Sequence, residues 1–240
     1  MSEIYLDNAA TTPMSPKVID VITEEMKNTY GNASSTYQLG RKARRVIDQA
    51  RHQIASAIGA KDGEIIFTSG GSESNNTAIF GTAYSRKEVG KKIITTKIEH
   101  PSVLNPMKRL EEQGYDVVYL DVDETGHISL DQLKKELTPD TILVSIMAVN
   151  NEVGSIMPIK EIGKLVAPTN AYFHVDAVQG MGTIDIDVKE MQIDFLSVSA
   201  HKINGPKFLG FLYENNDITI PDLVLGGEQE MKRRAGTENV

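Results

Sequence analysis

The stretch 197–207 brings together the residue types of a reactive amine site. An apolar segment, which we predict to be a buried strand over 193–198, runs into Lys202, and a Gly-Pro turn follows. A lysine can capture a carbonyl carbon as a Schiff base when burial or nearby cations lower the pKa of its amine. His201 and Lys207 are candidate cations, and the strand end is a candidate source of burial. The same pattern also suits a solvated loop.

Asp176 lies 26 positions before Lys202 and follows the mostly apolar run 172–175. That run is apolar enough to bury the carboxylate, and a buried carboxylate is costly unless a cation or hydrogen bonds compensate it. A protonated pyridine nitrogen is one cation that would do so. Asp176 therefore favours a reactive role for Lys202 over a solvated loop.

A turn rich in glycine and serine follows the predicted strand 65–68 and opens a helix. At Gly71 and Ser72, free N–H groups, the helix dipole and a hydroxyl could together bind a phosphate. The turn lacks the lysine of a P-loop and the glycine spacing of a dinucleotide-binding fingerprint. A Gly-Ser sequence is also common as a plain helix cap.

Two more polar residues follow predicted strands. His100, after the strand 92–96, could stack on an aromatic ring or move protons, although a lone histidine can equally be structural. Asn151, after the strand 141–148, could donate to a ligand oxygen, although asparagine is also common in turns.

These residues are consistent with a single cofactor. A phosphate on Gly71 and Ser72, a ring nitrogen on Asp176 and an aldehyde carbon on Lys202 are what pyridoxal 5'-phosphate requires of a protein. A catalytic metal is the competing idea, since His100 and His174 accompany several carboxylates, but the sequence has no HExxH motif and no close pair of histidines.

Strands and helices alternate along the chain, which predicts an α/β fold with a mostly parallel sheet covered on both faces. In such a sheet, ligands bind beyond the carboxyl ends of the strands. We expect an N-terminal segment over 1–14, extended or a short strand at 4–6, and one large domain over 15–240. The predicted strands are 65–68, 92–96, 116–120, 141–148, 171–175, 193–198 and 210–213. One predicted helix begins at Pro16. The others cover 37–58, about 71–84, 101–113, 129–137 and 158–166.

The composition excludes several classes of function. A net charge of -8 argues against direct nucleic-acid binding, and no apolar run approaches the ~20 residues of a membrane span. The chain has no cysteine, so it has no disulfide, thiolate metal site or cysteine nucleophile of its own. The first residues do not resemble a signal peptide, and we expect a cytoplasmic protein.

The predicted helix 37–58 carries a run of basic side chains, which suits either a solvated face or contact with an anion or partner. These residues are Arg41, Lys42, Arg44, Arg45 and Arg51.

Seven motifs, in order along the chain, resemble those of the cysteine desulfurases of the NifS/IscS-like branch, which are class V aminotransferase-type enzymes. The resemblance runs from Ile4 to Val240. The motifs are YLDNAATT at 5–12, SGGSESN at 69–75, EH at 99–100, NNEVG at 150–154, HVDAVQ at 174–179, SAHK at 199–202 and RAGTEN at 234–239.

The resemblance implies a role for each residue around the cofactor ring. Lys202 would carry the cofactor as a Schiff base and act as the proton-transfer base. Asp176 would pair with the pyridine nitrogen, and His100 would stack on the ring and assist proton transfer. Asn151 and Gln179 would bind near the phenolic oxygen of the ring.

The resemblance also implies a phosphate site made of Gly71, Ser72, Ser199 and His201. Thr237 would reach the phosphate of a second subunit, since relatives form homodimers that share their sites. The implied fold is the large domain of a pyridoxal-phosphate transferase, with a seven-stranded sheet.

The family reaction converts L-cysteine to L-alanine and passes sulfur, through a persulfide, to iron–sulfur or tRNA-thiolation partners. Asn8 and its neighbours would line the substrate end. Relatives place the persulfide-forming cysteine and a C-terminal small domain beyond the equivalent of Val240. We therefore expect a fragment that cannot complete desulfuration. A related lyase, such as a selenocysteine lyase, and a non-catalytic cofactor-binding subunit are the alternatives.

Overall fold

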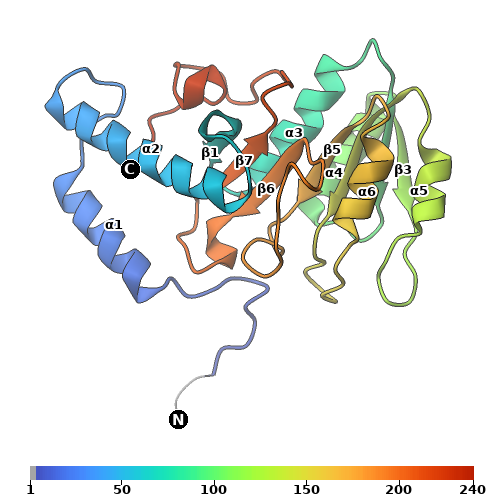
Figure 1. Cartoon of the computed structure of the whole chain (residues 1–240), viewed down its shortest axis with the longest axis horizontal. Coiled ribbons are helices and arrows are strands. Elements are labelled where there is room, and N and C mark those ends of the chain that lie inside the picture. Colours follow the sequence, from blue (N-terminus) through green and yellow to red (C-terminus); the bar gives the residue numbers. More distant parts are fainter. Residues whose placement is uncertain (1–3) are drawn as a thin grey trace.

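A computed structural model describes residues 4–240 and contains one seven-stranded sheet (Figure 1). The strand order is β1-β7-β6-β5-β4-β2-β3. β7 runs antiparallel to both of its neighbours, and the remaining pairs are parallel. The strands are β1 (Ile65–Thr68), β2 (Lys92–Thr96), β3 (Asp116–Leu120), β4 (Thr141–Met147), β5 (Tyr172–Asp176), β6 (Phe195–Ser199) and β7 (Gly210–Glu214).

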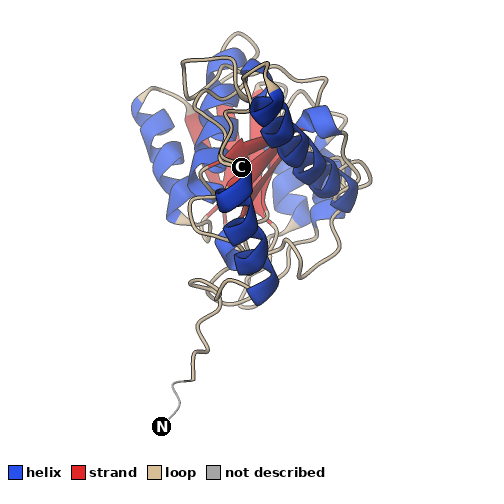
Figure 2. Ribbon diagram, turned by 90° about the vertical axis from the view of Figure 1, so that its left-hand side faces the viewer, coloured by secondary structure: helices blue, strands red, loops and turns tan. Residues whose placement is uncertain are grey.

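Helices cover both faces of the sheet, as Figure 2 shows. The long helices α3 and α4 pack together on one face, whereas α5, α6 and the end of α2 pack on the other. Because both faces are covered, the interior strand β4 is buried along its whole length, as its near-continuous apolar run predicts. The helices are α1 (Pro16–Asn28), α2 (Gln38–Ala57), α3 (Gly71–Ser85), α4 (Pro101–Glu112), α5 (Leu130–Glu136) and α6 (Ile159–Val166).

Local sequence explains where the helices begin. The side chains of Ser15 and Ser129 accept hydrogen bonds from the backbone N–H groups of Val18 and Gln132, so each serine caps its helix. α3 begins after Gly70, whose φ of 137° lies in a region that strongly favours glycine. The predicted helix boundaries therefore agree with the observed ones to within a few residues.

The N-terminal part differs from the rest of the chain. Residues 4–6 form no strand, which removes one of the two predicted alternatives there, and residues 1–3 lie outside the described part of the chain. α1 has no buried residue and lies to one side of the sheet in Figure 1. Among residues 4–240, no helix is long and apolar enough to cross a lipid bilayer.

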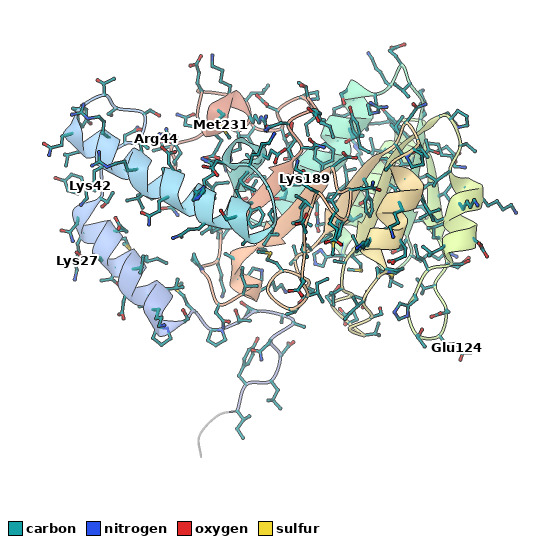
Figure 3. All side chains as sticks on the ribbon, in the orientation of Figure 1. Lys27, Lys42, Arg44, Glu124, Lys189 and Met231 are labelled. Carbon is teal, nitrogen blue, oxygen red and sulfur yellow. The ribbon has the colours of Figure 1, made fainter. Side chains whose placement is uncertain are left out.

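Part of the basic face of α2 is used within the chain, whereas Arg41 and Arg45 are exposed, as the solvated interpretation expects. Lys42 and Arg44, labelled in Figure 3, contact the Asn28 carbonyl and the Glu238 carboxylate. Arg51 is buried rather than exposed. It lies on the buried stripe of α2 with Ala43, Ile47 and Ala55, and its charge gives no sign of this.

Candidate active site

Five parallel strands deliver chemically active residues to one edge of the sheet. β1, β2, β4, β5 and β6 all point their carboxyl ends at this edge. A cavity of about 520 Å³ lies there. Every predicted site residue except Asn8 and Thr237 lines it. This is the location that the fold class predicts for a ligand site.

Lys202 follows β6 within a short 3₁₀ turn, Ala200–Lys202, and its side chain is half-buried. Burial lowers the pKa of its amine, against the opposing effect of the Asp7 and Asp176 carboxylates. Of the two predicted causes, burial is the one that lowers the pKa of Lys202, and nearby cations are not. The pKa of His201 is lowered by its own burial and by the charges of Lys202 and Lys207. Lys202 is thus an amine with a shifted pKa inside a cavity, as its predicted chemistry requires.

The N-terminal loop lies over this lysine. The Lys202 amine donates to the carbonyls of Ala9 and Ala10, the second at 2.9 Å. Thr12 binds the His201 carbonyl through both its N–H, at 2.9 Å, and its hydroxyl, at 2.8 Å. The hydroxyl of Thr12 also accepts from the N–H of Asn204 at 2.8 Å. Hydrogen bonds therefore hold the N-terminal loop against the Lys202 turn, although the two segments lie near opposite ends of the sequence.

The phosphate site predicted at the start of α3 has the required geometry. Among residues 4–240, the backbone N–H groups of Gly71 and Ser72 have no hydrogen-bond acceptor, as expected for the first turn of a helix. A Cβ atom on Gly71 would lie 2.5 Å from a methyl of Val178, so a larger residue there would force Val178 to move. Ser199 and His201 line the cavity together with Gly71 and Ser72. The same four residues also line a neighbouring cavity of about 490 Å³. Donors and a helix N-terminus thus converge on one anion-binding position.

Asp176 ends β5 with a buried side chain that lines the cavity. One oxygen accepts from the N–H of Val178 at 3.0 Å, and the other accepts from the amide of Asn75 at 2.8 Å. Burial raises the pKa of Asp176, while these two donors and the charges of His100 and Lys202 act in the opposite direction. The negative charge of this buried carboxylate is only partly compensated within residues 4–240, because neither group that donates to it directly carries a positive charge.

His100 caps α4 and lines the same cavity. Its Nδ1 accepts from the N–H of Ser102 at 3.1 Å and lies 2.8 Å from the Ser102 hydroxyl. That hydroxyl in turn accepts from the Asn75 amide at 2.8 Å. A continuous series of hydrogen bonds therefore joins Asp176 to His100 through Asn75 and Ser102.

The other predicted residues differ in how far the structure supports them. Asn151 and Gln179 line the cavity, where Gln179 donates to the Ala9 carbonyl at 2.8 Å. Asp7, Ala9 and Ala10 line the cavity, whereas Asn8 does not. Thr237 lies in a separate, mostly apolar cavity of about 330 Å³. Its predicted role across a dimer stays a prediction.

Asn75 and Ser102 are the site residues that sequence reasoning missed as functional groups. Asn75 stands inside the quoted motif 69–75, but its burial beneath Asp176 cannot be inferred from spacing. Ser102 could have been found from its position two residues after His100, in the first turn of the helix that His100 caps.

His174 is structural. It is fully buried between Ser145 and Ser197, with ring nitrogens 2.8 and 2.9 Å from their hydroxyls. Burial lowers its pKa to about 3, so the ring is neutral. No group of three or more His, Cys, Asp or Glu side chains suited to a metal ion occurs in the described part of the chain.

Comparison with known proteins accounts for this combination of fold and cleft. The profile of the class-V aminotransferases matches residues 4–240. The chain belongs to the class-V aminotransferase family. Proteins of this family depend on pyridoxal phosphate, which agrees with the groups that line the cavity.

Two relatives of this class-V chain carry names that describe an activity. The chain is 55% identical over its full length to a Bacillus subtilis protein named as a cysteine desulfurase, IscS 1, and covers 63% of it. It is 51% identical to the cysteine desulfurase IscS of Dictyoglomus turgidum, over 99% of the chain and 60% of the relative. The chain thus spans about three fifths of the length of these relatives.

Solved structures confirm the class-V fold. A NifS-like protein superposes with a TM-score of 0.97 at 39% identity, covering 99% of this chain and 66% of that one. SspA in complex with cysteine superposes with a TM-score of 0.95 at 41% identity, covering 98% and 69% of the two chains. The predicted α/β fold, with its mostly parallel sheet, is confirmed.

The cavity residues fit pyridoxal phosphate on the structure's own terms. Unpaired N–H groups at Gly71 and Ser72 suit the phosphate, and a half-buried amine at Lys202 suits the aldehyde. The incompletely compensated Asp176 carboxylate suits a protonated ring nitrogen. The donor set therefore matches three chemically different parts of one molecule.

Proposed function

We propose that this chain is the cofactor-binding part of a cysteine desulfurase that acts on L-cysteine. The observation that carries the proposal is the buried Asp176 carboxylate in the same cavity as the half-buried amine of Lys202. The choice of L-cysteine is supported by relatives named as cysteine desulfurases and by SspA in complex with cysteine.

Pyridoxal phosphate, when bound, supplies an electron sink that stabilises negative charge developing on the substrate. The chain's own residues orient and assist. Gly71, Ser72 and Ser199 would hold the phosphate, and Asp176 would keep a proton on the ring nitrogen. The lowered pKa of Lys202 makes a larger share of the neutral amine available, so Lys202 can bind the aldehyde and accept or return a proton.

Sulfur transfer needs a thiol that the 240 residues do not contain. In the proposed reaction the carbon–sulfur bond of L-cysteine breaks, L-alanine forms and the sulfur joins an acceptor thiol as a persulfide. We propose that this thiol belongs to a longer form of the chain or to another protein. Iron–sulfur assembly proteins and tRNA-thiolation enzymes are the proposed final recipients.

A homodimer is part of the proposal, because Thr237 lies outside the cavity of its own chain. In a dimer it would serve the phosphate of the partner subunit. The cytoplasmic location expected from the sequence stays a prediction.

The test is an absorbance titration of the chain after loading with pyridoxal phosphate. L-Cysteine should change the cofactor absorbance at lower concentration than L-serine, which differs by one oxygen in place of sulfur. Equal responses to the two amino acids would contradict specificity for cysteine. Cofactor binding without any response to L-cysteine would contradict the proposed substrate while leaving the cofactor site intact.

A further inference from the structure

The direction of the hydrogen bonds around His100 can be worked out from the donors that surround it. The backbone N–H of Ser102 can only donate, and it points at Nδ1 of His100 at 3.1 Å. A proton on Nδ1 would face this N–H directly. In a neutral ring, Nδ1 is therefore the acceptor and the proton lies on Nε2.

The Asn75 side chain sets the direction of the next bond. Its amide nitrogen lies 2.8 Å from an oxygen of Asp176 and 2.8 Å from the Ser102 hydroxyl oxygen. Turning the amide over would place its carbonyl oxygen against the carboxylate, which is also an acceptor. Asn75 therefore donates one hydrogen to Asp176 and the other to Ser102.

The Ser102 hydroxyl can then donate its hydrogen only to His100. Because its oxygen accepts from Asn75, its hydrogen is free to be donated to Nδ1 of His100, 2.8 Å away. Nδ1 thus receives two donors, the backbone N–H and the hydroxyl of one serine. Nε2 has no hydrogen-bond partner among residues 4–240, and the ring lines the cavity.

We propose that Asn75 and Ser102 are positioning residues that hold His100 in the tautomer with its proton on Nε2. His100 then offers the cavity a hydrogen-bond donor and not a base. This inference rests on the proposed function, because it assigns a role within that reaction. It implies that proton removal falls to Lys202, while His100 donates to a substrate or cofactor atom.

The tautomer can be measured on the cofactor-free chain by long-range proton–nitrogen NMR with nitrogen-15 histidine. The chain has five histidines, and His100→Gln assigns the signal of interest. The spectra are recorded at a pH at which no imidazolium signal remains. We expect a pyridine-type signal from Nδ1 and a pyrrole-type signal from Nε2.

Ser102→Ala removes the hydroxyl but keeps the backbone N–H. The ratio of the two tautomers should then fall about fivefold, the effect of losing one neutral hydrogen bond. Ser102→Thr keeps a hydroxyl and should restore the ratio. Thr125→Val is the matched control, since the Thr125 hydroxyl lies 2.9 Å from Nδ1 of His127, outside the cavity.

A pyrrole-type signal from Nδ1 of His100 in the unaltered chain would overturn the proposal. An unchanged tautomer ratio in Ser102→Ala, with the fold intact by circular dichroism, would also overturn it. Both measurements need no cofactor and no substrate. They can therefore fail while the absorbance response to L-cysteine succeeds, and the reverse also holds.

Discussion

Asp176 and Glu230 are two buried carboxylates whose surroundings differ. Glu230 forms a two-point ion pair with the buried Arg51, at 2.8 and 3.0 Å, and accepts from the N–H of Phe67 at 2.9 Å. Asp176 has the two neutral donors, Val178 and Asn75, and a face open to the cavity. The first carboxylate is compensated within the chain, whereas the second is left for a ligand to compensate.

The difference indicates how to tell a structural charge from a functional one. A buried charge with a complete set of partners fixes a segment, and Glu230 fixes the C-terminal segment against α2 and β1. Arg234, paired with Glu73 at 2.8 Å, adds a second attachment at the start of α3. A buried charge with incomplete compensation that faces a cavity indicates a binding site.

Asp176→Asn should produce the largest effect on chemistry. Without an ionised carboxylate the ring nitrogen of a bound cofactor loses the group that keeps it protonated. We expect the loaded chain to exchange the α-hydrogen of L-alanine with deuterated solvent about 1000-fold more slowly, in line with losses seen for single electrostatic groups. NMR of the amino acid measures this rate. A loss of less than tenfold would show that Asp176 is not the partner of the ring nitrogen.

Arg51→Met should produce the largest effect on stability. Removing one member of a buried pair leaves the Glu230 carboxylate uncompensated, so we expect the free energy of unfolding to fall by about 3–5 kcal/mol. Urea denaturation followed by circular dichroism measures the change. The double variant Arg51→Met/Glu230→Gln should recover part of the loss, because no buried charge then remains. A loss of under about 1 kcal/mol would refute a structural role for the pair.

Glu99→Gln sharpens the comparison with a third buried carboxyl group. Burial raises the pKa of Glu99 to about 8, and its Oε1 accepts from Met147 and Thr96. The folded chain therefore holds this proton to a higher pH than the unfolded chain does, so stability falls as the pH rises from the ordinary carboxyl range towards 8.

Glutamine cannot ionise, so the variant should lose less stability over that interval, by on the order of 4 kcal/mol. Glu214, whose pKa burial raises to about 7, contributes equally to both chains and cancels in the difference. Urea denaturation at a series of pH values measures the effect. Parallel pH curves for the two chains would contradict a proton on Glu99.

Lys97→Met should have the smallest effect. Lys97 pairs with Asp121 on the surface, where both side chains are more than half exposed. Solvent screening makes such pairs weak, so the free energy of unfolding should change by less than about 0.5 kcal/mol. A loss comparable to that of Arg51→Met would mean that burial does not decide the strength of ion pairs in this chain.

Much of this site could be predicted from the polar residues that directly follow predicted strands. Asp176 and Lys202 follow apolar strands, and the carboxyl ends of parallel strands meet at one edge, so their meeting needs no knowledge of side-chain geometry. Burial as a cause of the pKa shift at Lys202 could also be predicted, but the segment that covers the amine could not. That segment is the N-terminal loop, which is distant in sequence.

The roles of Arg51 and Asn75 also lay outside sequence reasoning. Arg51 is one of five basic residues in one helix, and it alone of the five lies on the buried stripe with Ala43, Ile47 and Ala55. Asn75 has a polar side chain in a polar turn, and its burial depends on the register between α3 and β5. Both roles are set by packing between elements, which a single sequence does not encode locally.

Reductive trapping of pyridoxal phosphate tests the central claim most directly. The chain is mixed with one equivalent of cofactor, treated with borohydride and digested, and the peptides are weighed by mass spectrometry. Our account predicts that the reduced cofactor is attached to Lys202, and that Lys202→Ala takes up none specifically. Attachment spread over surface lysines, with Lys202 unmodified, would contradict the account.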